Sequence, residues 1–240
     1  MPLNLLRTRY ARPAALAVLM LVVGTLSYAV IAPPGGPRSL KRFDPIRMAD
    51  FELRMWQAYY EKDRARLFVL LVSTLREQYR YSWAVATIEG FHLARAAGRF
   101  SELESNYDAV LPDLEAAYSR ARTWLGAGFD PASVARAELA WWVARRTPGR
   151  NSAAMVGDLI ADEYALLYET SRDLVVLPAQ LRAEAAALRD ANAANPEWDA
   201  IGRLLQQSYA ALSRALSTQY ARWAPRSGIH GPAKAGHHAH

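Results

Sequence analysis

The strongest constraint in this sequence is an uncharged segment of nineteen residues, from Ala14 to Ala32. Arg12 and Pro13 precede the segment, and a run of prolines and glycines over residues 33–37 follows it. Because an α-helix rises 1.5 Å per residue, the segment forms a helix about 28 Å long, close to the hydrocarbon thickness of a bilayer. We therefore expect a single transmembrane helix over residues 14–32.

A cleaved signal peptide is the alternative reading of this segment. Ser27 and Ala29 form a small-residue pair that suits cleavage before Val30, although the apolar run exceeds the usual length of about 7–15 residues. Basic residues flank the segment almost equally on its two sides, so the positive-inside rule gives only a weak preference. Since Arg12 directly abuts the apolar run, we expect the N-terminus inside and the domain outside the cytoplasm, as a single-pass membrane protein.

The positive charge of the chain lies outside its central part. The formal net charge is +6, but residues 51–220 carry 19 basic and 21 acidic residues and therefore a net charge of −2. A nucleic-acid partner is not expected from this distribution. The basic residues that flank the apolar segment instead predict contact with anionic lipid head groups. These membrane-proximal residues are Arg12, Arg38, Lys41 and Arg42.

Beyond residue 43, every periodic segment is helical, and no alternating run rich in Val, Ile and Thr predicts a strand. Asp44-Pro45 and Asp130-Pro131 are typical helix starts, because the aspartate caps free backbone N–H groups and proline fits the first turn. The predicted fold class is all-α, with a helical bundle of about seven helices in two layers. The predicted organisation is a basic segment (1–13), a transmembrane helix (14–32), a Pro/Gly/basic stalk (33–43), a helical domain (44–224) and a flexible Gly/Pro/His tail (225–240).

Several internal boundaries follow from local signals. A break or kink is expected near residues 61–63, a helix is expected from Ser82 to Gly98, and Ser101 is expected to open the next helix. For the helix that begins after Ser171, the predicted apolar face consists of Leu174, Leu177, Leu181 and Leu188.

The motifs of common enzymes are missing from the sequence. There is no phosphate-binding Gly-rich loop, no Gly-x-Ser-x-Gly and no His-Glu-x-x-His. Cysteine is absent, and His92 is the only histidine before His230, so thiolate sites and conventional histidine clusters are excluded. The sequence identifies no catalytic residue and no cofactor, and a non-catalytic protein is expected.

One pattern has the logic of a metal site. Glu89 and His92 form Glu-x-x-His and lie on one helix face, as in di-iron and di-manganese bundles. Glu52, Glu138 and Glu163 also fall on apolar stripes, where a carboxylate needs a cation, a proton or an arginine. A metal site of Glu52, Glu89, His92, Glu138 and Glu163 is one hypothesis, and arginine-paired glutamates with a packed histidine are the other.

Aromatic residues recur at helical spacing, which is typical of a core and also of a pocket for a flat or lipidic ligand. Trp141 and Trp142 are adjacent and cannot share one helix face, so one of them is expected at a partner surface or near lipid head groups. The residues considered for a pocket are Trp56, Tyr59, Tyr60, Trp83, Trp141, Trp142, Tyr164 and Tyr168.

The sequence thus favours a membrane-anchored, non-catalytic helical module. Its expected role is that of an accessory or assembly subunit, with membrane lipids and other proteins of a membrane complex as partners. The alternative is a membrane-tethered bundle that binds two metal ions or an apolar ligand, with an oxidoreductase as one form of it.

Overall fold

A computed structural model describes the backbone of residues 4–223 and the side chains of residue 16 and residues 18–218. The tail predicted over residues 225–240 and the side chain of Arg12 lie outside the described part. Within residues 4–223 the chain is all-α, with no strand, which confirms the predicted fold class. The elements are α1 (Asn4–Ile31), α2 (Pro45–Tyr60), α3 (Arg64–Tyr79), α4 (Trp83–Glu102), η1 (Tyr107–Val110), α5 (Leu111–Leu125), α6 (Pro131–Arg146), α7 (Ala153–Leu167), α8 (Arg172–Ala191) and α9 (Trp198–Trp223).

The two Asp-Pro starts are real N-caps. The Asp44 carboxylate accepts hydrogen bonds from the backbone N–H groups of Ile46 (2.9 Å) and Arg47 (3.1 Å). Asp130 accepts from the backbone N–H of Ser133 at 2.9 Å. In both helices proline occupies the first turn, where its missing N–H leaves no helical hydrogen bond unmade.

The expected break near residue 61 separates two helices, α2 and α3. Lys62 has a positive φ of 59°, a conformation that a helix interior does not allow, and Asp63 then caps α3 by accepting from the backbone N–H of Arg66 at 2.9 Å. The described body, α2 to α9, consequently has eight α-helices instead of about seven.

The expected boundary at Gly98 and Ser101 is wrong. The helix α4 continues through Gly98 to Glu102, and the Ser101 hydroxyl donates to the carbonyl of Gly98 at 2.6 Å inside the helix. The chain leaves the helix at Leu103, and Leu111 and Pro112 begin α5, with proline again in the first turn. Gly98 followed by Ser101 resembled the end of one helix and the cap of the next. The Ser101 side chain instead bonds to a backbone carbonyl of its own helix.

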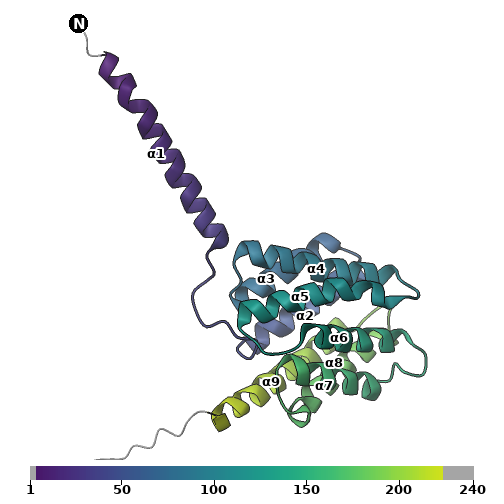
Figure 1. The fold of residues 1–240 in the computed structure, drawn as a ribbon. Helices are drawn as coiled ribbons and strands as arrows, with labels where there is room; N and C mark the ends of the chain where they lie inside the picture. The colour runs from purple at the N-terminus through teal and green to yellow at the C-terminus, as the bar shows by residue number, and fades with distance from the viewer. Residues whose placement is uncertain (1–3, 224–240) are drawn as a thin grey trace, which may run out of the picture.

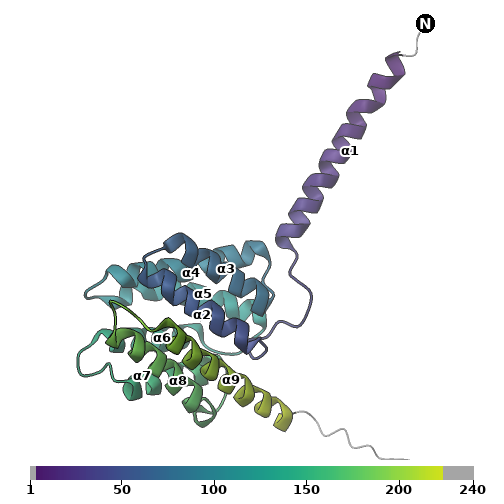
Figure 2. The same ribbon diagram turned by 180° about the vertical axis from the view of Figure 1, so that it is seen from behind.

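The helices of the body form a closed ring. Each helix from α2 to α9 packs against the next one along the chain, and α9 packs back against α2. In Figure 1 the helices α2 to α5 make up the upper part of the body and α6 to α9 the lower part, and Figure 2 shows α2 and α9 side by side from behind. This closure surrounds a central space with side chains from almost every helix.

The apolar face predicted for α8 is only partly correct, because Leu188 packs against the core but Leu177 does not. Leu177 is 60% exposed, whereas Val175, Pro178 and a series of alanines are buried. Small side chains let α8 approach its neighbours closely: a Cβ added to Gly157 of α7 would lie 3.2 Å from the backbone Cα of Gln180 in α8. Close approach, rather than leucine packing, therefore determines which face of α8 is buried.

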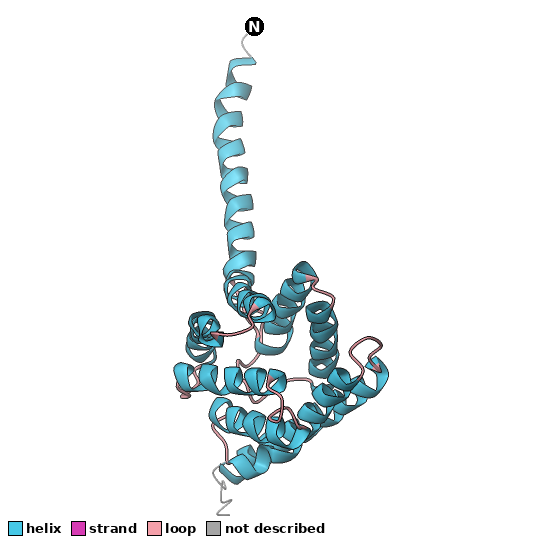
Figure 3. Cartoon of the chain, turned by 90° about the vertical axis from the view of Figure 1, so that its right-hand side faces the viewer, coloured by secondary structure: helices cyan, strands magenta, loops and turns pink. Residues whose placement is uncertain are grey.

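The helix α1 stands away from the body (Figures 1 and 3). Its large apolar side chains face outward, with Met20 74% and Leu21 71% exposed. Among the described residues, no helix combines the length and the apolar character needed to cross a membrane, so the predicted span over residues 14–32 is not supported. The side chains of Ala14, Ala15 and Ala17 in that segment lie outside the described part.

The segment predicted to be a stalk lies against the body. The guanidinium of Arg38 stacks over Trp124 at 4.1 Å, and Leu40 and Phe43 are partly buried against the core. The backbone N–H of Asp44 donates to the side-chain oxygen of Gln78 at 2.9 Å. These contacts attach the last residues of the linker to α3 and α5.

Candidate functional site: a central cavity

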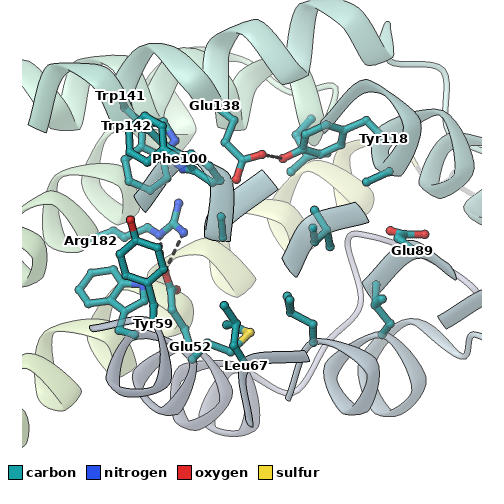
Figure 4. Close-up of a pocket in the computed structure, with 18 of the residues that line it drawn as sticks. Glu52, Tyr59, Leu67, Glu89, Phe100, Tyr118, Glu138, Trp141, Trp142 and Arg182 are labelled. Atoms are coloured by element: carbon teal, nitrogen blue, oxygen red, sulfur yellow. Dashed lines mark hydrogen bonds and ion pairs between the residues drawn. The ribbon is translucent and has the colours of Figure 1, made fainter. Parts of the chain in front are cut away.

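A cavity of about 540 Å³ lies inside the ring of helices. Protein cores rarely leave voids larger than a water molecule, whereas ligand pockets commonly measure about 300–1,000 Å³. Figure 4 shows charged and aromatic side chains at one side of this space, around Arg182 and Tyr59, and Glu89 at the opposite side. The lining also includes aliphatic residues: Leu67, Leu71, Leu75, Leu93, Ala97, Ala117 and Ala121.

A buried ion pair lies at the wall of the cavity. Both Nε and Nη2 of Arg182, on α8, lie 2.7 Å from Oε1 of Glu52, on α2. Glu52 is 3% exposed, and its second carboxylate oxygen has no hydrogen-bond partner. The guanidinium also lies 4.8 Å from the ring centre of Trp141. One oxygen of Glu52 is therefore held by the protein, and the other is left as an acceptor.

The glutamates of α6 and α7 are held by neutral donors. Tyr118 donates to Glu138 at 2.7 Å, and the indole N–H of Trp141 donates to Glu163 at 2.6 Å. Burial raises the pKa of Glu138 despite the hydrogen bond from Tyr118. Burial and the charge of Glu138 together raise the pKa of Glu163 to about 8. At neutral pH the side chain of Glu163 consequently favours its protonated, uncharged form.

Glu89 marks the far side of the cavity. It is 3% exposed, and burial raises its pKa to about 8, against the opposing effects of Tyr81 and Arg120. One carboxylate oxygen of Glu89 and the hydroxyl of Tyr81 face each other without completing a hydrogen bond. Glu89 is therefore a buried acid that favours its uncharged form at neutral pH. One of its oxygens has no hydrogen-bond partner at the far side of the cavity.

His92 does not face the other four residues of the predicted metal site. Its Nδ1 lies 3.0 Å from a carboxylate oxygen of Asp113, which also accepts from Arg95. Burial disfavours the charge of Asp113, but the hydrogen bonds from Arg95 and His92 outweigh burial and lower the pKa of this carboxyl group. Among the described residues, no group of three or more His, Asp or Glu side chains is placed to hold a metal ion.

The five predicted metal ligands are thus not brought together as one metal site. Glu52, Glu138 and Glu163 approach Arg182, Glu89 lies across the cavity, and His92 pairs with Asp113. The other hypothesis expected arginine-paired glutamates: Glu52 is paired in this way with Arg182, whereas Glu138 and Glu163 are held by Tyr118 and Trp141.

The predicted aromatic pocket is partly assembled. The side chains of Trp56, Tyr59, Tyr60, Trp141 and Trp142 line the cavity. Trp83 is 48% exposed on the outside of α4, and the buried Tyr164 and Tyr168 pack edge to face at 5.5 Å next to the cavity.

Both adjacent tryptophans line the cavity, and the expected contact of one of them with a partner or with lipid head groups stays a prediction. Trp141 is buried, Trp142 is partly buried, and both reach the cavity. Large indole side chains can reach the same space from adjacent positions because they extend in different directions from the helix, with ring planes 82° apart.

The mouth of the cavity is a cationic, aromatic rim. The lining residues that are exposed to solvent are Arg146 and Asp190, at the C-terminal ends of α6 and α8. The guanidinium of Arg146 lies 3.9 Å from the ring centre of Phe100, and that of Arg189 lies 3.2 Å from the ring centre of Tyr60. The helix dipole favours arginines at helix C-termini. The arginines that line the mouth of the cavity therefore also stabilise the helices on which they lie.

Sequence reasoning missed Arg182, which organises the site. The signal was available in part: Val175, Ala179, Arg182 and Ala186 follow one another at steps of four, three and four residues along α8. Such steps put the arginine on the buried face, and a buried arginine needs a carboxylate. Which carboxylate it meets depends on α2, 130 residues away in the sequence.

Searches for similar proteins support no family assignment, because no family model, no curated protein and no solved structure matches this chain.

Proposed function

We propose that this protein is a membrane-anchored, non-catalytic helical domain that binds a small, largely apolar molecule in its central cavity. The observation that carries the proposal is the cavity of about 540 Å³, enclosed by a closed ring of helices and lined mainly by aliphatic and aromatic side chains. A hydrophobic space of this size gains free energy when an apolar ligand replaces the water in it.

The polar atoms of the cavity support binding rather than turnover. Glu52, Glu138 and Glu163 are each engaged by a donor from another helix. The buried polar atoms left over are one oxygen of Glu52 at one side of the cavity and, at the opposite side, one oxygen of Glu89 that faces the hydroxyl of Tyr81. Such positions orient a ligand.

A neutral fluorescent probe tests the binding function directly. N-phenyl-1-naphthylamine is expected to bind with enhanced emission, and Ala117→Phe, which fills the cavity from α5, is expected to weaken binding at least about tenfold (about 1.4 kcal/mol). Ala140→Phe is the matched control, because Ala140 is exposed on α6 and does not line the cavity. Unchanged affinity in a folded Ala117→Phe variant, or no probe binding by the wild type, overturns the proposal.

Membrane attachment is the second part of the proposal. It is supported by the uncharged sequence of residues 14–32 and by the exposed apolar side chains of a helix that stands away from the body. The protein is expected to stay with membranes in carbonate, and an alkaline phosphatase fused after Trp223 is expected to be active outside the cytoplasm. Release by carbonate, or a mature N-terminus at Val30, refutes anchoring by this segment.

A docking role is a second candidate function, favoured by one surface. Four large apolar side chains are exposed on the neighbouring helices α3 and α4: Val69, Trp83, Ile88 and Phe91. Exposed apolar clusters commonly mark protein interfaces. If a subunit of a membrane complex covers this surface, Phe91→Glu should abolish its co-purification from native membranes without loss of stability. A native mass spectrum that shows only the monomer after mild detergent extraction contradicts this candidate.

A further inference from the structure

The charges at the rim of the cavity are unequal. Arg145, Arg146 and Arg189 contribute three positive charges to the lining, and Asp190 contributes one negative charge. Asp190 pairs with Arg145 at 2.8 Å and with Arg189 at 3.2 Å. One carboxylate thus serves two arginines, and the rim retains a net positive charge.

Among the residues whose side chains the structure describes, no carboxylate pairs with the rim cation Arg146. This arginine donates to the backbone carbonyls of Phe100 (2.6 Å) and Leu103 (3.2 Å) and to the hydroxyl of Tyr59 (2.9 Å), all of them neutral acceptors. A guanidinium has five N–H donors, so these three hydrogen bonds leave two unused. Two adjacent guanidinium donors match the two oxygens of a carboxylate or phosphate.

A second rim donor also lacks an acceptor. The Nε atom of Arg189 is buried and has no hydrogen-bond partner, while the guanidinium is fixed over the ring of Tyr60. A buried N–H without an acceptor is unfavourable by about 1–3 kcal/mol. A polar atom of a ligand that reaches this N–H would supply the missing acceptor.

The interior has no comparable site for a charged group. The positive charge of Arg182 is matched by Glu52, and burial favours the uncharged forms of Glu89 and Glu163 by raising the pKa of each to about 8. The lining also includes aliphatic residues, among them Leu67 and Leu93. The cavity is therefore charged at its mouth and apolar inside, which is the polarity of a single-chain amphiphile.

We propose that the ligand is a single-chain amphiphile whose anionic head group is bound by Arg146 at the rim and whose apolar chain extends toward Glu89. This inference rests on the proposed binding function and adds the chemical class and the orientation of the ligand. The head group is a carboxylate or a phosphate monoester, since the unused guanidinium donors fit both.

Displacement of the neutral probe by four molecules with the same chain tests the head-group rule. Dodecanoate and dodecyl phosphate are expected to compete at least about tenfold better than dodecanol at neutral pH, because hydrogen bonds to charged groups are the stronger ones. Dodecylamine is expected to be the weakest competitor. The ratio between the carboxylate and the phosphate identifies which of the two anions the rim prefers.

Arg146→Gln is expected to remove the advantage of the anions and to leave the affinity for dodecanol unchanged. Arg150→Gln is the matched control: it makes the same charge change at an exposed position beyond the end of α6 that does not line the cavity. Equal losses in both variants would mean that only the general positive field acts, and Arg146 would not be the head-group site.

The failure of this inference is distinguishable from the failure of the proposed function. If dodecanol competes as well as dodecanoate in the wild type, the head-group proposal is overturned while apolar binding stands. If neither the probe nor any of the four molecules binds, the proposed function itself is overturned.

Discussion

Removal of Arg182 is the most informative perturbation of this fold. Arg182→Met keeps most of the side-chain volume but leaves Glu52, 3% exposed, without the cation that lies 2.7 Å from it. The arginine side chain is itself only 15% exposed, so solvent screens the pair little. Loss of one partner of a buried ion pair destabilises proteins by about 3–5 kcal/mol. For a domain of this size that loss lowers the midpoint of thermal unfolding by about 6–20 °C.

Urea unfolding followed by circular dichroism measures the effect. The double variant Arg182→Met/Glu52→Met removes both charges and replaces the pair with apolar side chains, so most of the lost stability should return. A single variant within about 1 kcal/mol of the wild type would refute the buried pair. A double variant no more stable than the single one would show that the loss came from packing around Trp141 rather than from an unpaired Glu52.

Three further outcomes are expected from the described contacts. Because the pKa of Glu89 is raised to about 8 from an ordinary 4.5, the folded state keeps a proton that the unfolded state releases; stability therefore falls as pH rises between these values, by about 1.4 kcal/mol per unit. Urea titrations at several pH values should show a shallower fall for Glu89→Gln, and equal slopes would argue against a buried acid. Gly157→Val should destabilise by about 1–3 kcal/mol, because its Cβ would lie 3.2 Å from the Cα of Gln180; a thermal midpoint equal to that of the wild type would contradict the close approach of α7 and α8. Asp130→Ala should lose about 0.5–2 kcal/mol through the cap on Ser133, and Asp130→Asn should recover most of it in the same measurement.

The linker connects the proposed membrane anchor with the cavity. Leu40 lines the cavity, and Phe43 packs edge to face on Tyr209 of α9 at 5.9 Å. The segment that joins α1 to the body thus contributes to the lining of the cavity. This segment, predicted as a Pro/Gly/basic stalk, lies against the body because Leu40 and Phe43 are partly buried against the core.

The sequence by itself determined the class of the fold and most helix starts. Asp44, Asp63, Ser82 and Asp130 each accept hydrogen bonds from backbone N–H groups two or three residues ahead, and such contacts depend only on neighbouring residues. The absence of alternating apolar patterns likewise argued against a sheet, since a half-buried strand needs one apolar face. At Gly98 and Ser101 the local signals predicted a helix boundary, but α4 continues to Glu102.

Only the tertiary structure decided what the helices enclose. Arg182 meets Glu52 across 130 residues and His92 meets Asp113 across 21, and neither pairing follows from spacing along one helix. The cavity lies within the ring that α9 closes against α2, and burial raises the pKa of Glu89. Capping and periodicity act over about four residues, whereas burial, and with it the chemistry of a buried carboxylate, is fixed by which helices pack together.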